Sequence, residues 1–374
     1  MIYLDNNAST PVDFEVAHFT YSALKGVFGN PSSSHEFGSR SKSTIDKARS
    51  EVAALIGVSS EEIIFTSGGT ESNNLAIIGL ADRKKKGHII SSVIEHPSVL
   101  NPCRHLEGRG FDCSYLGVGT DGRVTVEDIR RAIRKDTVLI TIMHANNETG
   151  VLQPLEEIGK LAREREIIFH ADAAQTIGKI PVNAQQLNVD MLTIVSHKFY
   201  GPKGIGALYI RKGIEVSPIL FGAGHENGLR PGTENVHGIA GLGKACEIAG
   251  FSIHKRASRV KRVTEMLLHA LRSKIDGLRL NGHETHRLPN TLNVCIPGVD
   301  ALILLDRIKD RVAASAGSAC HAGHKKPSSV LTAMGLSDAD AMSSIRLSTG
   351  KDTTEDEIKE AVEIIAKAVE ELKK

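Results

Sequence analysis

The stretch Ser196–Gly206 carries the residue with the clearest chemical potential. Its Lys198 lies just beyond an apolar run, Met191–Val195, and the glycines and proline that follow force a loop. A lysine held at the end of a buried strand can lose its charge through burial, and its neutral amine can form a Schiff base with a carbonyl compound. A surface lysine is the alternative interpretation, and Lys203 is a second candidate. We favour Lys198 because it lies beside His197 and closer to the strand.

A small-residue turn, Ser67-Gly-Gly-Thr70, could bind an anion. It lies between an apolar run, Glu62–Phe65, and a helix predicted over Glu71–Leu80. Small residues allow close approach of the backbone, and free N–H groups at a helix start favour phosphate. The segment is not a Walker A loop, because no Gly-Lys-Ser/Thr follows it. An ordinary turn with Thr70 as helix N-cap is the alternative interpretation.

Two further side chains are suited to holding an aromatic ring. Asp172 ends the apolar run Ile167–Ala171, and it needs a partner because an unpaired buried charge is costly. A protonated pyridine nitrogen would supply that partner. His96 could lie flat against the same ring, and a hydrogen-bonded turn histidine before Pro97 explains it equally well. A phosphate cradle, a Schiff-base lysine and a buried aspartate together indicate pyridoxal 5'-phosphate (PLP) as the cofactor.

The elements that must position these residues alternate in type along the first two thirds of the chain. Short apolar runs alternate with amphipathic stretches, and polar residues follow the ends of the runs. This pattern predicts an α/β fold with a large domain, whose mostly parallel sheet is covered by helices and forms its ligand crevice at the carboxyl ends of the strands. The predicted strands are Glu62–Phe65, His88–Ser91, Thr137–Ile142, Ile167–Ala171 and Met191–Val195, and Pro154–Arg165 is predicted to be a helix.

The last third of the chain changes character and predicts a smaller α+β C-terminal domain. It begins with a long helical connector, rich in Lys and Arg, over about 236–276. We expect the large domain over 12–250 and the small domain over 251–374, together with the N-terminal segment 1–11. The elements expected there are a strand over Thr291–Ile296, a helix over Ala301–Ile308, a small-residue loop over 315–324, a strand over Ile345–Ser348 and a helix from about Thr354.

Composition argues against several classes of protein. The 374 residues carry 46 Lys and Arg against 44 Asp and Glu, a net charge of +2, which argues against a nucleic-acid protein with a broad basic surface. Charged residues make up 24% and apolar residues 41%, as in globular chains. No apolar run has the length of a membrane helix, and no secretory signal is recognised. Five scattered cysteines argue against a disulfide framework and favour a reducing, cytoplasmic location.

Taken together, the motifs resemble those of the cysteine desulfurases of the NifS/IscS type, in the class-V aminotransferase group of fold-type-I PLP enzymes. The resemblance runs nearly end to end, so coincidence is a poor explanation. The matching segments are Tyr3–Pro11, Gly29–His35, Thr66–Asn74, Glu95–Ser98, Asn146–Gly150, His170–Gln175, Ser196–Lys198, Gly201–Gly204, Arg230–Thr233, Ser315–Cys320 and Ile345–Ser348.

The resemblance implies roles for the residues around the cofactor. Lys198 would hold PLP as a Schiff base, and Asp172 would pair with the pyridinium nitrogen. His96 would stack on the ring and move protons. Gln175 would bond the phenolic oxygen, and Asn146 would line the same pocket. The residues that would hold the phosphate are Gly69, Thr70, Ser196 and His197.

The same resemblance implies the substrate and the assembly. Arg346 would clamp the carboxylate of L-cysteine, as a bidentate guanidinium does well. Asn7, Ala8 and Asn146 would border the substrate. Thr233 would reach the phosphate bound to the neighbouring subunit, which makes the enzyme an obligate homodimer.

Cys320 would be the nucleophile of the reaction. It lies in a loop of small residues, and the positive charge of Lys325 and Lys326 nearby favours the thiolate. A buried, inert role suits Cys246 and Cys295 better, because both lie in apolar patterns. The resemblance implies conversion of L-cysteine to L-alanine, with the sulfur kept on Cys320 as a persulfide. A sulfur-acceptor or iron–sulfur scaffold protein would receive it, for iron–sulfur cluster assembly or tRNA thiolation.

Two positions depart from the family pattern. Relatives have a small residue, often Ser, where this chain has Val195, so one hydroxyl group for the phosphate is missing. Ser196 is a candidate to replace it. After Cys320 the chain has His321 and His324, which together with the thiol could ligate a metal. We predict no metal site. The spacing from this loop to Pro327-Ser328 matches the family, which agrees with a role in sulfur transfer.

Three other functions are left open by the sequence. A selenocysteine lyase shares the cofactor chemistry. An aminotransferase needs no thiol, so Cys320 argues against it. A scaffold that binds sulfur acceptors without catalysis has only Val195 in its favour, against the retained Lys198, Asp172, His96 and Arg346. The identity of the sulfur acceptor cannot be read from the sequence.

Overall fold

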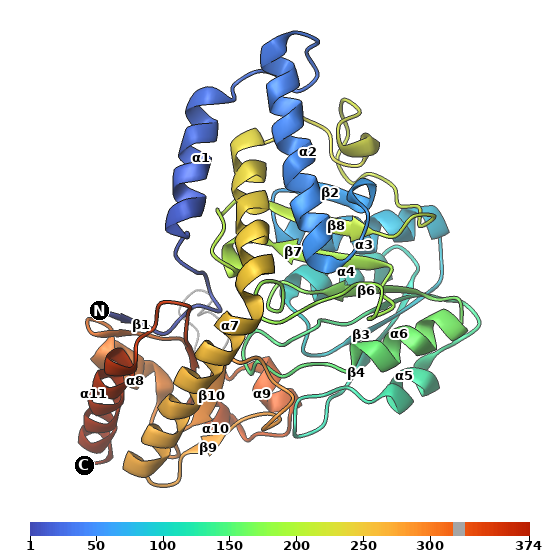
Figure 1. Ribbon diagram of the computed structural model, residues 1–374. Helices are drawn as coiled ribbons and strands as arrows, with labels where there is room; N and C mark the ends of the chain where they lie inside the picture. The colour runs from blue at the N-terminus through green and yellow to red at the C-terminus, as the bar shows by residue number, and fades with distance from the viewer. Residues whose placement is uncertain (317–325) are drawn as a thin grey trace.

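A computed structural model describes residues 1–316 and 326–374, and Figure 1 shows their arrangement. Within these residues a seven-stranded sheet forms the centre of the larger part of the molecule. The strand pairs β7–β6, β6–β5, β5–β3 and β3–β4 are parallel, whereas β8 runs antiparallel to both β7 and β2. The predicted α/β fold with a mostly parallel sheet is therefore confirmed. Across the sheet the strands are β2 (Ile63–Thr66), β8 (Gly206–Ile210), β7 (Met191–Val195), β6 (Ile168–Asp172), β5 (Thr137–Thr141), β3 (His88–Ser92) and β4 (Asp112–Leu116).

Helices cover both faces of this sheet because successive strand residues point to opposite sides. In β2, Ile63 and Phe65 join one hydrophobic core, and Ile64 joins the core on the other face. The first core is covered by α2 (Glu36–Ile56), α5 (Val126–Ala132), α6 (Leu155–Glu164) and the first half of α7 (Val236–Lys274). The second core is covered by α3 (Gly69–Lys84) and α4 (Pro97–Glu107), and α1 (Phe14–Gly26) packs against α7.

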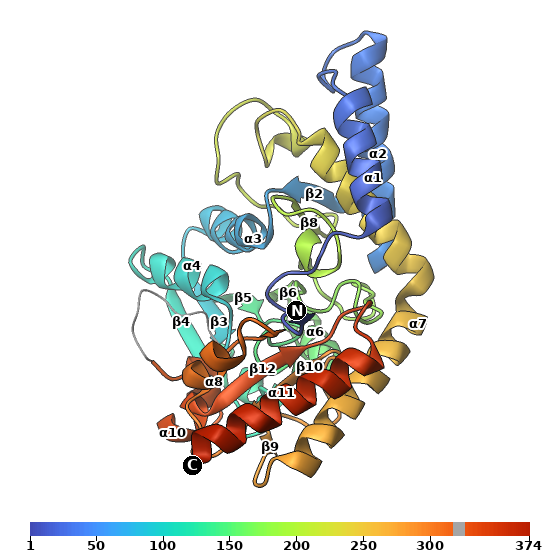
Figure 2. The same ribbon diagram turned by 90° about the vertical axis from the view of Figure 1, so that its left-hand side faces the viewer.

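The smaller part of the molecule has a core of its own. An antiparallel sheet there has the order β12-β10-β9, and the N-terminal strand β1 pairs in parallel with β11. Figure 2 shows α11 and the second half of α7 lying over this part. Its elements are β1 (Ile2–Tyr3), β9 (Arg279–Leu280), β10 (Thr291–Cys295), α8 (Ala301–Ile308), β11 (Val312–Ala313), α9 (Ser329–Ala333), α10 (Asp338–Met342), β12 (Ser344–Ser348) and α11 (Glu355–Lys373).

The long helix α7 joins the two parts (Figure 1). Residues 236–249 of α7 belong to the core beneath the large sheet, and Val263, Leu267 and Leu271 belong to the core of the smaller part. Ile2 and Leu4 pack into that smaller core as well. We therefore keep the division into 12–250 and 251–374 with 1–11 as a proposal, supported by these two cores. Its boundary falls inside α7.

The topology brings several strand ends to one edge of the large sheet. Strand β2 is antiparallel to β8, which is antiparallel to β7, so β2, β7 and β6 all run in the same direction. The segments after Thr66, Asp172 and Val195 consequently emerge at one edge. Short helical turns are η1 (Ser60–Glu62), η2 (Ser196–Lys198) directly after β7, and η3 (Glu226–Gly228). Among the described helices, none has the length and apolar character needed to cross a membrane.

Candidate active site

Lys198 lies in the turn η2, at the edge where the strand ends meet. Its Nζ donates hydrogen bonds to the main-chain oxygens of Asn7 at 2.8 Å and Ala8 at 2.7 Å. Burial, helped by the positive charge of Arg346, lowers the pKa of the amine to about 8, and the carboxylate of Asp172 opposes the shift. A lysine with this pKa is a better nucleophile and base near neutral pH than an ordinary surface lysine.

Asp172, at the end of β6, is buried and held by two donors. The main-chain N–H of Ala174 donates to Oδ1 at 2.9 Å, and Nδ2 of Asn73 donates to Oδ2 at 2.7 Å. The same Asn73 nitrogen donates to Oγ of Ser98 at 2.8 Å, and this Oγ lies 2.7 Å from Nδ1 of His96. A continuous chain of hydrogen bonds therefore links the Asp172 carboxylate to the His96 ring and orients both.

His96 is the N-cap of α4, where its Nδ1 accepts a hydrogen bond from the main-chain N–H of Ser98 at 3.1 Å. Partial burial lowers the pKa of its imidazole; the Lys198 charge adds to this shift and the Asp172 carboxylate opposes it. A neutral ring can stack on an aromatic ligand and pass protons. The ring borders a cavity of about 520 Å³ lined by Thr70, Asn74, Ile78, His96, Pro97, Ser98, Asn101, Pro102 and His105.

The first turn of α3 offers N–H groups to an anion on the same cavity. The helix begins at Gly69, two residues earlier than the sequence predicted, and no side chain caps it. Gly68 has a φ of 148°, and a Cβ added to Gly69 would lie 2.6 Å from Cγ2 of Val195, so both positions favour glycine. Thr70 is exposed there. The apolar side chain of Val195 lies beside this turn, and its role as an anion cradle stays a prediction.

Asn7 connects the N-terminal segment to the rest of the site. It is buried; its main-chain N–H donates to Oγ of Ser348 at 2.9 Å and its Nδ2 donates to Oγ1 of Thr291 at 2.9 Å. Nε2 of Gln175 donates to the main-chain oxygen of Asn7 at 3.0 Å. Asn7, Ala8 and Gln175, which the sequence assigned to the site, are thus brought to Lys198.

Asn146 is close to these residues in the fold, but its side chain is fully engaged. Its Nδ2 donates to the main-chain oxygen of Ile94 at 3.1 Å. Its Oδ1 accepts from the main-chain N–H groups of Glu148 at 2.9 Å and Thr149 at 3.0 Å. The amide of Asn146 therefore shapes the loop after β5.

Arg346, on β12, is buried beside the N-terminal segment. Its Nη2 pairs with Oδ1 of Asp5 at 2.7 Å, and its Nη1 donates to the main-chain oxygen of Asn147 at 3.0 Å. Oγ of Ser315 donates to the same Asp5 oxygen at 2.9 Å. Within residues 1–316 and 326–374, Nε of Arg346 has no partner, so this edge of the guanidinium remains for a carboxylate.

The two residues before Lys198 differ in their surroundings. Nδ1 of His197 lies 3.2 Å from Oγ of Ser9, and burial, with the Lys198 charge, lowers the pKa of His197 to about 4. His197 is therefore neutral at pH 7. The Ser196 hydroxyl is buried with no partner in the described part of the chain, and a Cβ on Gly201 would lie 2.1 Å from it. Ser196 thus faces the loop that follows it.

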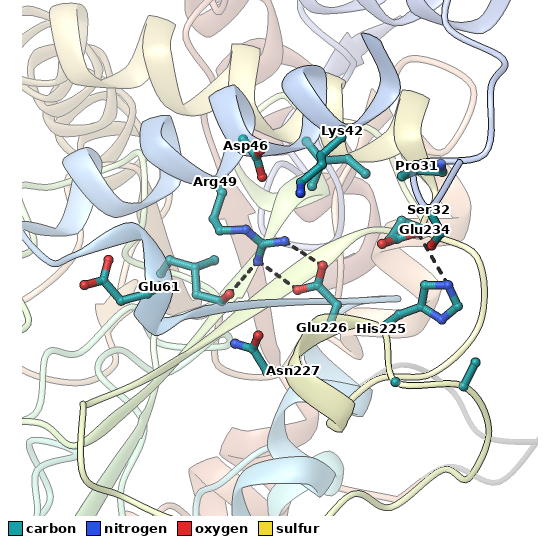
Figure 3. A pocket seen from close by; sticks show the side chains of 14 residues that line it. Pro31, Ser32, Lys42, Asp46, Arg49, Glu61, His225, Glu226, Asn227 and Glu234 are labelled. Carbon is teal, nitrogen blue, oxygen red and sulfur yellow. Dashed lines mark hydrogen bonds and ion pairs between the residues drawn. The ribbon is translucent and has the colours of Figure 1, made fainter. Parts of the chain in front are cut away.

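Thr233 lies exposed on the connection between β8 and α7. Figure 3 shows how this connection is fixed to the body of the protein: Arg49 of α2 forms a bidentate ion pair with Glu226, at 2.8 and 2.6 Å. Arg49 also donates to the main-chain oxygen of Ile63, and Glu226 accepts from the main-chain N–H of Phe65 at 2.8 Å. Arg49, Ile63 and Glu226 are among the residues that line a second cavity, of about 650 Å³. The contacts of Arg49 and Glu226 fix this connection at Glu226, seven residues before Thr233.

Cys320, the expected nucleophile, lies outside the described residues, as do His321 and His324 of the alternative metal site. On either side of 317–325, the chain is anchored near the site. Ser315 bonds Asp5, and Oγ of Ser328 donates to Oε2 of Glu148 at 2.5 Å.

Sequence reasoning missed three residues that the structure brings to the site. Asn73 connects Asp172 to Ser98. Lys179 donates to the side chains of Asn7 and Gln175. Glu95 is buried beside the site; burial raises its pKa to about 8, and the Asp172 charge adds to the rise. Asn73 stood within a matching motif, whereas Lys179 had only its position four residues after Gln175 as a signal.

Comparisons with known proteins agree with this geometry. The sequence profile described as Aminotransferase class-V matches residues 2–361. The cysteine desulfurase IscS of Dictyoglomus turgidum is 45% identical over 375 residues, covering 100% of this chain and 95% of the relative. A solved NifS-like protein superposes with a TM-score of 0.92 at 36% identity, covering 98% of each chain. A structure described as SspA in complex with cysteine gives a TM-score of 0.84 at 39% identity, covering 95% of this chain and 100% of its own.

The fold is thus that of the class-V aminotransferases. The chain belongs to this family, in its group of NifS/IscS-type cysteine desulfurases.

Proposed function

We propose that the protein is a PLP-dependent cysteine desulfurase. The reaction converts L-cysteine and the thiol of Cys320 to L-alanine and a persulfide on Cys320. The sulfur atom moves from the substrate Cβ to the Cys320 thiol, so no outside oxidant is needed. The observation that carries the proposal is the amine of Lys198, whose pKa is lowered to about 8 beside the carboxylate of Asp172. Relatives named cysteine desulfurase at 45% identity over the whole chain support the choice of substrate.

The chemistry of the donor set fits PLP. Lys198 would hold its aldehyde carbon, Asp172 would pair with its ring nitrogen, and His96 would cover its ring. The uncapped first turn of α3, with Gly69 and Thr70, and the neutral His197 would hold the phosphate. Two buried groups at the site, Nε of Arg346 and Oδ1 of Asn73, have no partner among the described residues, which is the pattern expected where a polar ligand completes a site. When bound, PLP supplies an electron sink for charge that develops at the substrate Cα.

The chain's own residues then bind and orient the substrate. The free Nε edge of Arg346 takes the substrate carboxylate, while Asp5 and the main-chain oxygen of Asn147 hold the guanidinium in place. The amine of Lys198 takes the proton from the substrate Cα and returns it, which a pKa of about 8 allows in both directions near neutral pH. His96 carries a second proton at the exposed face of the cavity.

Cys320 is proposed to remove the sulfur. Its thiolate attacks the sulfur of L-cysteine, and the new S–S bond forms as the Cβ–S bond breaks. The electron pair of the broken bond stays with the three-carbon fragment, Cβ takes up a proton, and the product leaves as L-alanine. The persulfide is then available to an acceptor protein. We propose an iron–sulfur scaffold or a tRNA-thiolation protein as the acceptor, because relatives carry the IscS name. The free thiol required for this step favours a cytoplasmic location.

We further propose that the active unit is a homodimer. The helices α1, α2 and α7 lie side by side (Figures 1 and 2). Large apolar side chains on these helices and on the α1–α2 connection are exposed to solvent. On a soluble domain such a surface marks a contact with another protein. Thr233, on the connection that the Arg49–Glu226 ion pair attaches to α2, would then serve the phosphate site of the neighbouring subunit. The exposed side chains are Phe14, Phe19, Tyr21, Leu24, Phe28, Phe37 and Phe251.

The function is tested by following L-cysteine turnover with added PLP and a reducing thiol. We expect alanine and sulfide in equal amounts. No alanine from a protein that has bound PLP would contradict the proposal, and a parallel reaction with L-selenocysteine decides whether the chain is a selenocysteine lyase instead.

A further inference from the structure

Lys179 occupies a place in the site that the proposed reaction does not use. Its Nζ donates to Oδ1 of Asn7 at 2.9 Å and to Oε1 of Gln175 at 2.7 Å. Lys179 is partly accessible to solvent as a residue, and its amine is hydrogen-bonded to the amide side chains of Asn7 and Gln175. The lysine therefore connects the segment that follows β6 to the N-terminal segment.

The hydrogen bonds around this amine suit its neutral form. A neutral amine has two N–H donors and a charged one has three, and within residues 1–316 and 326–374 Nζ has two acceptors, both of them neutral amides. Burial lowers the pKa of Lys179 well below its usual range, and the charges of Lys198 and Arg346 act in the same direction. A positive charge on Lys179 would be repelled by the positive charges of Lys198 and Arg346.

The contacts with Lys179 and with Asn7 together decide which end of the Gln175 amide faces Lys198. An amide has one end that accepts and one end that donates. Because Oε1 of Gln175 accepts from Lys179, Nε2 is turned to the main-chain oxygen of Asn7 at 3.0 Å. That same oxygen accepts from Nζ of Lys198 at 2.8 Å. Gln175 thus offers a donor, rather than an acceptor, to whatever lies next to Lys198.

We propose that Lys179 is a positioning residue that helps to fix the orientation of the Gln175 amide so that its N–H group faces the Lys198 site. The inference rests on the proposed function, in which Gln175 meets the phenolic oxygen of PLP. A donor at that point stabilises the deprotonated phenolic oxygen, whereas a carbonyl oxygen would repel it. Lys179 therefore sets the proton affinity of the bound cofactor through Gln175, without touching the reacting atoms.

The experiment compares Lys179→Met, Gln175→Ala and the double variant, each loaded with PLP. The readout is the pH midpoint at which the visible absorption band of the bound cofactor changes. In Lys179→Met the Gln175 amide loses the donor to its Oε1 and is held only by the bond from Nε2 to the main-chain oxygen of Asn7, so its orientation is less fixed. We expect the midpoint to rise by up to about one pH unit, a tenfold change in proton affinity. In the Gln175→Ala background the same substitution should move the midpoint by less than a quarter of that amount, because the two residues act as one unit.

Two results would overturn the inference. An unchanged midpoint in Lys179→Met would show that Gln175 keeps its orientation unaided. An equal shift with and without Gln175 would show that Lys179 acts through its own charge. Lys160→Met, at an exposed position on α6, is the matched control and should leave the midpoint unchanged.

A second variant guards against loss of folding. If Lys179→Met does not fold, Lys179→Gln retains N–H donors and should shift the midpoint by less than Gln175→Ala does; a larger shift would count against the inference. Thermal unfolding of each apoprotein reports whether it is folded. Alanine production by the wild type tests the proposed function separately, so a failure of that function and a failure of the Lys179 inference give different results.

Discussion

The amine of Lys198 donates a 2.8 Å hydrogen bond to the main-chain oxygen of Asn7, a residue 191 positions earlier in the chain. The N-terminal segment is therefore part of the wall against which this lysine is held. The same segment pairs Asp5 with Arg346 at 2.7 Å. One short stretch of chain thus positions both the residue proposed to hold the cofactor and the residue proposed to hold the substrate.

The first prediction concerns the pH dependence of cofactor uptake. The neutral amine is the reactive form of Lys198, and its fraction rises as pH increases through the pKa of about 8. The rate at which the apoprotein takes up PLP should increase up to about tenfold per pH unit below pH 8 and level off above it. Stopped-flow absorbance measures the rate. A rate that stays flat between pH 6.5 and 9 would refute the lowered pKa, and Lys198→Ala should form no covalent adduct on borohydride reduction.

The second prediction concerns Asn73. Its side chain donates to the Asp172 carboxylate and to Ser98, so Asn73→Ala should loosen the group proposed to pair with the ring nitrogen. A hydrogen bond to a charged group contributes about 1.5–3 kcal/mol, so PLP should dissociate at least tenfold faster. Dialysis against a PLP scavenger gives the rate. Gln186→Ala, which removes an exposed amide, is the control and should retain PLP like the wild type. Equal retention by both variants would exclude this role for Asn73.

The third prediction concerns Val195. Its Cγ2 lies beside Gly69 in the first turn of α3, and the family resemblance implies a small residue, often Ser, at this position. Val195→Ser should add one donor to the phosphate and lower the Kd for PLP about tenfold, equivalent to ~1.4 kcal/mol. Val195→Ala removes the same methyl groups without adding a hydroxyl, so it should not tighten binding. Equal affinities for the Ser and Ala variants would show that position 195 does not reach the phosphate.

The fourth prediction concerns the stability of the apoprotein. Burial raises the pKa of Glu95 to about 8, and its carboxyl accepts from Oγ of Ser92 at 2.7 Å and from the main-chain N–H of Met143 at 3.0 Å. Between about pH 4.5 and 8 the folded chain keeps a proton that the unfolded chain has released. This contribution to the free energy of unfolding is present at low pH and lost as pH rises through about 8.

Glu95→Gln tests that contribution, because a glutamine stays neutral at every pH. Its free energy of unfolding relative to wild type should increase by at least ~1.4 kcal/mol between pH 5.5 and pH 9, the equivalent of one pKa unit. Urea unfolding at the two pH values measures the difference. A difference that does not depend on pH would mean that Glu95 is ionised in the folded protein.

The sequence predicted the parts of the site that follow from strand ends. Lys198 and Asp172 come just after apolar runs, and parallel strands place such positions at one edge. The first turn of α3 was readable for a similar reason, since two glycines between a strand and a helix leave the backbone open. These features depend on local pattern, which the sequence contains in full.

The connections between these residues could not be predicted. Asn73 is a polar residue on a helix, and only the packing of α3 against the sheet brings it to Asp172, 99 residues away. Lys179 looks like a solvated turn lysine until Asn7 is placed beside it, 172 residues away. Residues of this kind act through tertiary contacts, so their types carry no local signal of their roles.

A single-turnover reaction with L-cysteine, without any reducing thiol, tests the central claim most directly. The wild type loaded with PLP should release one L-alanine per active site and carry one extra sulfur atom on the peptide that contains Cys320, as seen by mass spectrometry. Cys320→Ser should bind PLP and produce neither. Alanine formed by Cys320→Ser at the wild-type rate, or the extra sulfur on a different peptide, would contradict the account.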